Sequence, residues 1–182
     1  MTARALYFVN HPGLSKARSL IGHLHDRAIR DTALIAAVLF LADGEHLYAY
    51  GRGLYGETWY RTTETGLETV RGTHLDALFH HRELGKPGFR FDRDAVSQSD
   101  LEVIASAIAE VQDCVAGLGA ASGFVESKPW LARLADAVRA GRLWQDGPAG
   151  APLDLLTPVR ARFGDDAEGV EDQAFVIRHG SY

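Results

Sequence analysis

The spacing of apolar residues along the chain predicts a set of helices arranged around one that is buried on all sides. Residues Ala33 to Phe40 are apolar without interruption, and a helix that lacks a polar face is enclosed by other elements. Asp31 is a suitable N-cap for this helix, and glycine after Tyr50 accepts the left-handed conformation that closes a helix. We therefore expect a central helix from Thr32 to Tyr50.

Three further stretches carry an apolar stripe on one side, which is typical of helices that pack against a core. Helices are expected from Ser15 to about Arg30, from Asp100 to about Gly117 and from Pro129 to about Ala140. A shorter helix is expected from Thr73 to about Leu84. The residues expected to face the core are Ala17, Leu20, Ile21, Leu24, Ala28, Leu101, Ile104, Ile108, Val111, Val115, Trp130, Leu134 and Val138.

Extended structure is predicted after the central helix. Leu54 to Thr63 is rich in aromatic and β-branched residues, which favour strands, and the glycines in and around it permit a tight bend. Phe89 to Phe91 is a second candidate strand that could pair with the first, and Ala174 to Ile177 is a third. These patterns predict an α+β fold that is mainly α: a helical bundle around the buried central helix, with a small β-hairpin.

The chain is expected to form one domain with a C-terminal extension. Its 182 residues suit a single core. A turn-rich stretch from Gln145 to Pro152 separates residues 1–142, the expected domain, from most of residues 143–182, the extension. We expect this extension, which includes an acidic stretch from Asp165 to Asp172, to dock on the same domain.

Composition narrows the classes of function. The net charge of −5 argues against a nucleic-acid partner, because phosphate contacts require a basic face. The single cysteine permits no internal disulfide and no cysteine-based zinc site. No apolar run reaches the roughly 18 residues of a membrane span, and Met1 to Val9 lacks the long apolar run of a signal peptide. We therefore expect a cytoplasmic protein without a membrane partner.

Three polar residues, Asp43, Glu45 and His46, gather at the end of the central helix. A carboxylate beside an imidazole suits acid–base catalysis. The alternative is a structural polar cluster, in which Asp43 and His46 lie three residues apart on one helix face and bond each other or the following turn. We favour the structural interpretation, and we expect no catalytic residue, no metal ligand and no cofactor.

An aromatic ribbon follows the central helix and is the best candidate for a partner-binding surface. Exposed tyrosine, tryptophan and arginine side chains dominate the binding energy of many interfaces. Alternate members of the ribbon could instead pack onto the central helix. The residues that we expect to contact a partner are Tyr50, Arg52, Tyr55, Trp59, Tyr60 and Arg61.

The stretch from Leu34 to Ala137 resembles the Panacea domain, the SocA-like antitoxin family. Members carry a segment close to LLYFADxxHLxxYGRPITGDxYxAMxxGPVPSxLYDxL. The family's prolines after Tyr-Gly-Arg and before the next helix are missing here. The matching positions in this chain are Leu39-Phe40, Ala42-Asp43, His46-Leu47, Tyr50-Gly51-Arg52, Gly56-Glu57, Trp59, Gly66 and Leu75 to Leu78.

Two later stretches extend the resemblance. Ser97 to Ile104 is similar to the family's helix start LSESDLExL, and Lys128-Pro129-Trp130 is similar to its closing region. The resemblance implies an antitoxin-like protein that binds a small protein toxin and neutralises it by occlusion, without a cofactor and without enzymatic activity. One branch of the family acts as a proteolytic adaptor that delivers its toxin to a AAA+ protease, so the resemblance leaves that role open.

Two alternatives from other classes remain at this point. The first is a small metal-dependent hydrolase that uses His25, Asp26, Asp43 and His46. The second is a DNA-binding autorepressor, which the negative net charge disfavours. The sequence names neither the toxin nor the oligomeric state.

Overall fold

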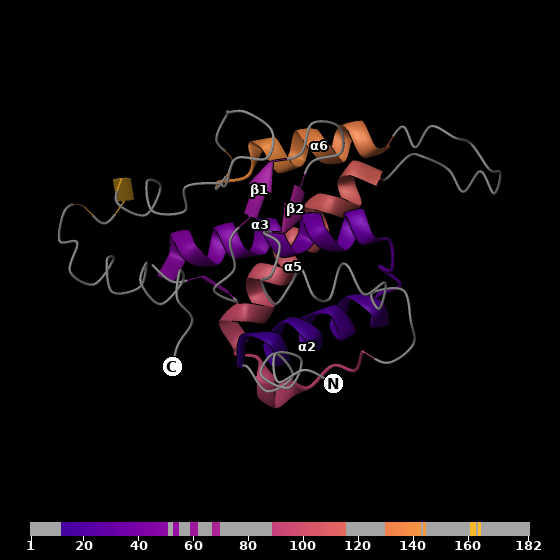
Figure 1. Cartoon of the computed structure of the whole chain (residues 1–182), viewed down its shortest axis with the longest axis vertical. Coiled ribbons are helices and arrows are strands. Elements are labelled where there is room, and N and C mark those ends of the chain that lie inside the picture. Colours follow the sequence, from indigo (N-terminus) through magenta and orange to yellow (C-terminus); the bar gives the residue numbers. More distant parts are fainter. Residues whose placement is uncertain are drawn as a thin grey trace, which may run out of the picture.

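The helices of this chain enclose one of their number, α3. The computed structural model describes residues 12–50, 53–54, 59–61, 67–69, 89–115, 130–142, 144, 161–162 and 164. α3 runs through the middle of the molecule, with α6 on one side and α2 on the other, and α5 crosses it (Figure 1). The elements are α2 (Pro12–Asp26), α3 (Thr32–Tyr50), β1 (Trp59–Arg61), β2 (Leu67–Thr69), η1 (Arg93–Ala95), α5 (Gln98–Val115) and α6 (Trp130–Ala140).

α3 is the central helix that the sequence predicts, with the same first and last residues. Every residue from Ile35 to Gly44 is buried, as a helix without a polar face requires. Its start is fixed by Asp31, whose Oδ1 accepts hydrogen bonds from the N–H groups of Ala33 at 2.9 Å and Leu34 at 3.4 Å. α3 packs mainly against α5 and also against α6.

α3 is also long and apolar enough to cross a membrane by length and composition alone. However, 67% of the relevant window is buried inside the fold. The core helix of a globular protein meets the same criterion, so this helix is weak support for a membrane span.

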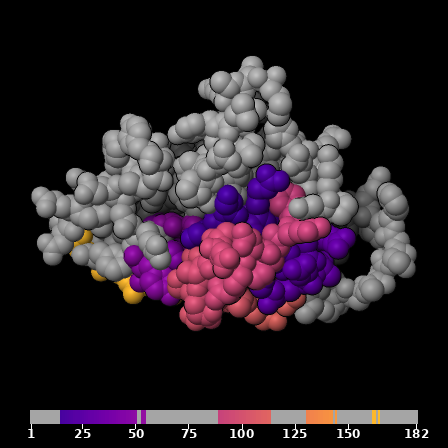
Figure 2. Space-filling view, turned by 90° about the horizontal axis from the view of Figure 1, so that it is seen from below, coloured from indigo at the N-terminus to yellow at the C-terminus, as the bar shows by residue number. Residues whose placement is uncertain are grey.

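α2 is covered by the chain that leads into η1. The hydroxyl of Ser19 donates to the Asp92 carbonyl and accepts from the Asp92 N–H, both at 2.8 Å. A Cβ atom at Gly22 would lie 2.4 Å from the carbonyl carbon of Arg90, so only glycine permits this approach. Phe89 and Phe91 pack against the core from this segment. Side chains of α2 and of the chain from residue 89 lie next to each other on the face shown in Figure 2.

α2 ends earlier than the sequence predicts. The helix stops at Asp26, and Ala28 is exposed with a φ of 62°, in the left-handed region. The Ala28 N–H donates to the His25 carbonyl at 2.9 Å, and the Ile29 N–H donates to the Leu24 carbonyl at 3.0 Å. This pair of bonds is a Schellman motif with alanine in the place that glycine usually takes. The spacing of apolar residues predicted that Ala28 faces the core, and this prediction is wrong because Ala28 is exposed.

α5 and α6 turn most of the expected residues toward the core. Ile104, Ile108 and Val111 of α5 and Leu134 and Val138 of α6 are buried. Leu101, Trp130 and also Trp144 are partly buried and pack against the same cluster. These helices join α2 and α3 in one hydrophobic core.

The predicted α+β class is wrong. Helices account for 79% of the residues whose side chains the structure describes, and none of those residues lies in a strand. Phe89 to Phe91 forms no strand, and the backbone segments β1 and β2 pair antiparallel over only three residues each. Such a short ladder adds no layer to the core, so a β-hairpin as a part of the architecture is not supported. β propensity depends on packing partners, and of the described residues between Leu54 and Thr63 only Trp59–Arg61 pairs as a strand.

Three other expected elements lie outside the described residues. They are the helix from Thr73 to Leu84, the terminal strand from Ala174 to Ile177 and the acidic stretch from Asp165 to Asp172.

Candidate functional site

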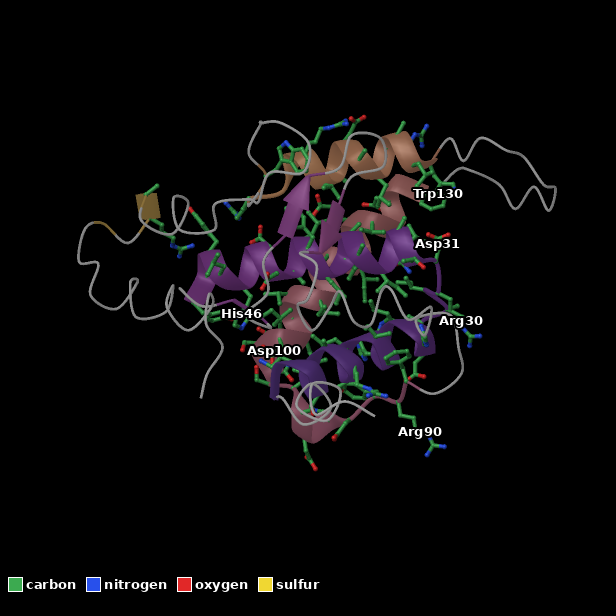
Figure 3. All side chains as sticks on the ribbon, in the orientation of Figure 1. Arg30, Asp31, His46, Arg90, Asp100 and Trp130 are labelled. Atoms are coloured by element: carbon green, nitrogen blue, oxygen red, sulfur yellow. The ribbon has the colours of Figure 1, made fainter. Side chains whose placement is uncertain are left out.

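A buried carboxylate, that of Asp100, lies where α2, α3 and α5 meet. Asp100 Oδ2 is 3.1 Å from the Lys16 ammonium, and Asp100 Oδ1 is 3.2 Å from His46 Nε2. The side chains of His46 and Asp100 are fully buried, and that of Lys16 is 24% exposed. His46 and Asp100 face each other between α3 and the start of α5 (Figure 3). We call Lys16, His46 and Asp100 the buried charge triad.

Asp100 also starts α5. Its Oδ2 accepts a hydrogen bond from the Ser97 N–H at 2.7 Å, and its own N–H donates to Ser97 Oγ at 3.2 Å. This reciprocal pair is a capping box with aspartate at the third position. The capping bonds with Ser97 therefore fix the orientation of the carboxylate that contacts α2 and α3.

The environment of Asp100 favours its charged form. Burial alone raises the pKa of this carboxyl, but the contact with His46, the Ser97 N–H and the Lys16 ammonium outweigh that effect. Together they hold the pKa of Asp100 well below its ordinary range.

Asp43 connects α3 to the chain that follows it. Its side chain is buried, with 1% of its surface exposed, and its Oδ1 accepts a hydrogen bond from the Leu54 N–H at 2.6 Å. Leu54 is itself part of the core. Of the two structural bonds considered from the sequence, the structure shows the one to the following turn.

Glu45 belongs to a different cluster from Asp43 and His46. Its Oε1 is 2.6 Å from Arg142 Nε, just after α6, and both side chains are nearly half exposed. The Arg142 guanidinium lies 4.1 Å from the centre of the Tyr48 ring, and the Arg162 guanidinium lies 4.0 Å from it. Both distances are those of cation–π contacts. We call Glu45, Tyr48, Arg142 and Arg162 the guanidinium cluster. The predicted cluster of Asp43, Glu45 and His46 thus divides between three sets of contacts.

Tyr50 is the described member of the predicted partner-binding surface. It lies at the end of α3 and is 45% exposed. Its ring packs on that of His46 with 4.7 Å between ring centres. Arg52 and Tyr55 lie outside the described residues, as do the side chains of Trp59, Tyr60 and Arg61.

The residues of the hydrolase alternative are not drawn together. His25 and Asp26 lie at the end of α2, where the His25 ring meets the edge of Phe89 at 5.7 Å. His25 follows Lys16 by nine residues, a rise of about 13 Å along the helix away from the triad. Among the residues that the structure describes, no group of three or more His, Cys, Asp or Glu side chains could hold a metal ion.

Lys16, Asp100, Arg142 and Arg162 were not identified from the sequence as site residues. The Ser97-to-Asp100 spacing does indicate a helix start, but nothing in the sequence predicts that Asp100 reaches two other helices. Arg162 carries no sequence signal at all, because its partner Tyr48 lies more than a hundred residues away.

No family model, curated protein or solved structure matches this chain at a significant level.

Proposed function

We propose that this chain is an antitoxin-like protein that binds a small protein toxin and blocks it by occlusion. One observation carries the proposal. The sequence resembles the Panacea family at two separate stretches, around Asp43 to Arg52 and around Ser97 to Ile104. His46 from the first stretch and Asp100 from the second meet at 3.2 Å, and both are fully buried. Because residues from the two similar stretches are in contact in the core, the two similarities support one domain of this family more strongly than they would if the stretches lay apart.

The proposed interface is the exposed end of α3 and the ribbon that follows it. Tyr50 presents nearly half of its surface while its ring rests on the buried His46. A large aromatic side chain that is held by a rigid neighbour loses little conformational freedom on binding, which suits an interface anchor. The ribbon residues Arg52, Tyr55, Trp59, Tyr60 and Arg61 complete the proposed surface. The mechanism needs no cofactor, and we place the protein in the cytoplasm.

Growth rescue tests this function directly. Each small open reading frame that flanks the gene is expressed from an inducible promoter in a host cell, with and without this protein. We expect one of them to arrest growth alone and to be tolerated with this protein present. Tyr50→Ala should weaken the rescue, and Arg30→Ala is the matched control. Arg30 is exposed and lies at the other end of α3 from His46 (Figure 3).

The half-life of the toxin in cells that contain this protein distinguishes simple occlusion from the adaptor role that the resemblance leaves open. Occlusion leaves the half-life of the toxin unchanged, whereas delivery to a AAA+ protease shortens it in a host that contains the protease. Absence of rescue, together with about one transition metal per purified chain, would contradict the antitoxin proposal and favour the hydrolase.

A further inference from the structure

The C-terminal end of α2 carries three exposed arginines that no described carboxylate neutralises. Arg27 and Arg30 follow the last residue of α2, and Arg90 lies where the chain crosses this helix at Gly22. The side chains of Arg30 and Arg90 form no hydrogen bond or ion pair with another described residue. Both point outward on the same side of the molecule (Figure 3). We call Arg27, Arg30 and Arg90 the arginine surface.

Arg27 has an uncharged partner. Its Nη1 donates to His23 Nδ1 at 3.0 Å, because a guanidinium group can only donate. Burial lowers the pKa of His23 and the positive charge of Arg27 lowers it further, while the negative charge of Asp26 opposes them only in part. His23 is therefore mostly uncharged at pH 7 and does not offset the charge of Arg27. Asp26 is exposed and forms no ion pair with a described residue.

The end of α2 is closed by backbone groups, not by arginine side chains. The N–H groups of Arg27 and Ile29 donate to the Leu24 carbonyl at 3.0 Å. The N–H of Ala28 donates to the His25 carbonyl at 2.9 Å. Arginine side chains near the end of a helix can bond such carbonyls, but backbone donors already do so here. The guanidinium groups are therefore left to face solvent.

Other cations of the described structure have carboxylate partners. The pairs are Lys16 with Asp100, Arg139 with Asp136 and Arg142 with Glu45. Arg133 of α6 is exposed and has no described partner, but α6 lies on the other side of α3 from α2 (Figure 1). Unpaired positive charge thus gathers at the end of α2 although the chain as a whole carries a net charge of −5.

The chemistry of this surface suits carboxylates. A planar guanidinium group binds a carboxylate or a phosphate through two parallel hydrogen bonds. The negative charge of the whole chain opposes a long polyanion such as nucleic acid more than a short acidic peptide. From Gly22, beneath Arg90, to Arg27 the helical rise is about 7.5 Å. Alternate side chains of an extended segment are about 6.6 Å apart, so two carboxylates of one segment match this spacing.

We propose that the arginine surface binds an extended acidic segment of a protein partner through guanidinium–carboxylate pairs. This surface is separate from the proposed toxin surface, because Arg30 lies at the other end of α3 from His46, on which Tyr50 packs (Figure 3). A protein bound at the arginine surface leaves Tyr50 accessible, so the chain can hold this partner and a toxin together. The proposal goes beyond the proposed function and does not rest on it.

Fluorescence anisotropy with the purified full chain tests the surface. The probe is a labelled peptide of about eight alternating aspartate and glutamate residues. We expect saturable binding that weakens as the salt concentration rises. Arg30→Gln and Arg90→Gln should each weaken binding about two- to five-fold, as the loss of an exposed ion pair does. The double variant should weaken it by about the product of the two effects. Circular dichroism should show that these exposed substitutions leave the helices intact.

Three controls make the result specific. Arg133→Gln removes the same charge from α6 and should leave the affinity for the acidic peptide unchanged. A peptide of alternating asparagine and glutamine residues should not bind. A thymidine oligonucleotide of the same charge as the acidic peptide should bind more weakly than the peptide. No binding of the acidic peptide at about 1 mM, or equal weakening by Arg133→Gln, would overturn the proposal. Tighter binding of the oligonucleotide would replace the acidic protein segment with nucleic acid.

Discussion

At the scale of single residues, Asp100 joins three helices through one carboxylate. One fully buried carboxylate caps α5 through Ser97, meets the Lys16 ammonium of α2 and meets His46 of α3. A buried charge of this kind is tolerated because Oδ2 is paired with Lys16 and the Ser97 N–H, while Oδ1 lies 3.2 Å from His46 Nε2. The triad therefore links three helices at one point, and the loss of any member leaves the others in an unfavourable environment.

Asp100→Asn tests this coupling. The substitution keeps the shape of the side chain but leaves Lys16 and His46 without the negative charge. Breaking a buried charge pair from one side destabilises proteins by roughly 3 kcal/mol, and we expect a loss of that order in the free energy of unfolding. Urea denaturation followed by circular dichroism measures it. Asp136→Asn, at an exposed position of α6, is the control and should change stability little, because its salt bridge with Arg139 is on the surface.

The pH dependence of stability should carry the same signature. The pKa of Asp100 in the folded protein lies below its ordinary value of 3.8, so the unfolded chain binds a proton more readily than the folded one. The stabilisation from Asp100 is therefore complete above about pH 4 and is lost as the pH falls toward the folded-state pKa. Unfolding free energies at pH 5 and pH 3 should differ less in Asp100→Asn than in the wild type. Equal pH dependence in the two proteins would show that other carboxyls dominate acid unfolding.

The sequence identified only one member of this triad, His46, as a site residue. Asp43, Glu45 and His46 were grouped because they are neighbours on one helix, but the structure gives each a different set of partners. Residues that are adjacent along a helix predict local contacts, whereas Lys16 and Asp100 approach His46 through the packing of three helices. Contacts between residues on different helices leave no periodic pattern in the sequence, so the sequence did not predict them.

At the scale of elements, the end of α2 is strained. Ala28 occupies the left-handed region at a φ of 62°, where the Cβ atom of an L-residue is crowded. Because Ala28 is exposed, its methyl group contributes no core packing that could offset this cost. Spacing alone had placed Ala28 on the buried stripe, since an alanine gives no sign that the helix has ended.

Ala28→Gly should therefore stabilise the protein by about 0.5–1 kcal/mol, because glycine adopts this conformation without strain. Thermal unfolding at constant pH measures the gain. Ala105→Gly in α5 is the matched control: it is exposed but lies inside a helix, where glycine should destabilise by up to about 1 kcal/mol. A loss of stability in Ala28→Gly would mean that the Schellman end of α2 is not formed in solution.

Helices were predicted better than strands for a physical reason. The bounds of α3 follow from a local pattern: a cap at Asp31, a continuous apolar run and a glycine after Tyr50. A strand is stabilised only by partners that can be distant in sequence, so the composition of Leu54 to Thr63 could not fix the three-residue length of the ladder that Trp59–Arg61 forms with Leu67–Thr69. Phe89 and Phe91 show the same limit, because they pack against the α2 side of the core without forming a strand.

The whole molecule is expected to unfold as one unit. Buried residues from α2, α3, α5 and α6 belong to a single hydrophobic cluster, so no described helix has a separate core. Small domains with one core usually unfold in a single cooperative transition. Circular dichroism at 222 nm and tryptophan fluorescence should give superimposable urea curves, because Trp130 and Trp144 pack against that cluster. A fluorescence transition at lower urea than the helical signal would instead contradict a single cooperative transition.

The close approach at Gly22 has a consequence for ancestry. The chain at Arg90 crosses α2 at a distance that admits no side chain, so this position constrains descent in a way that surface residues do not. A distant relative that kept the crossing should keep glycine there, together with the histidine and aspartate that meet at 3.2 Å. Glycine at position 22, histidine at 46 and aspartate at 100 together form a short sequence pattern by which distant homologues of low overall identity could be recognised.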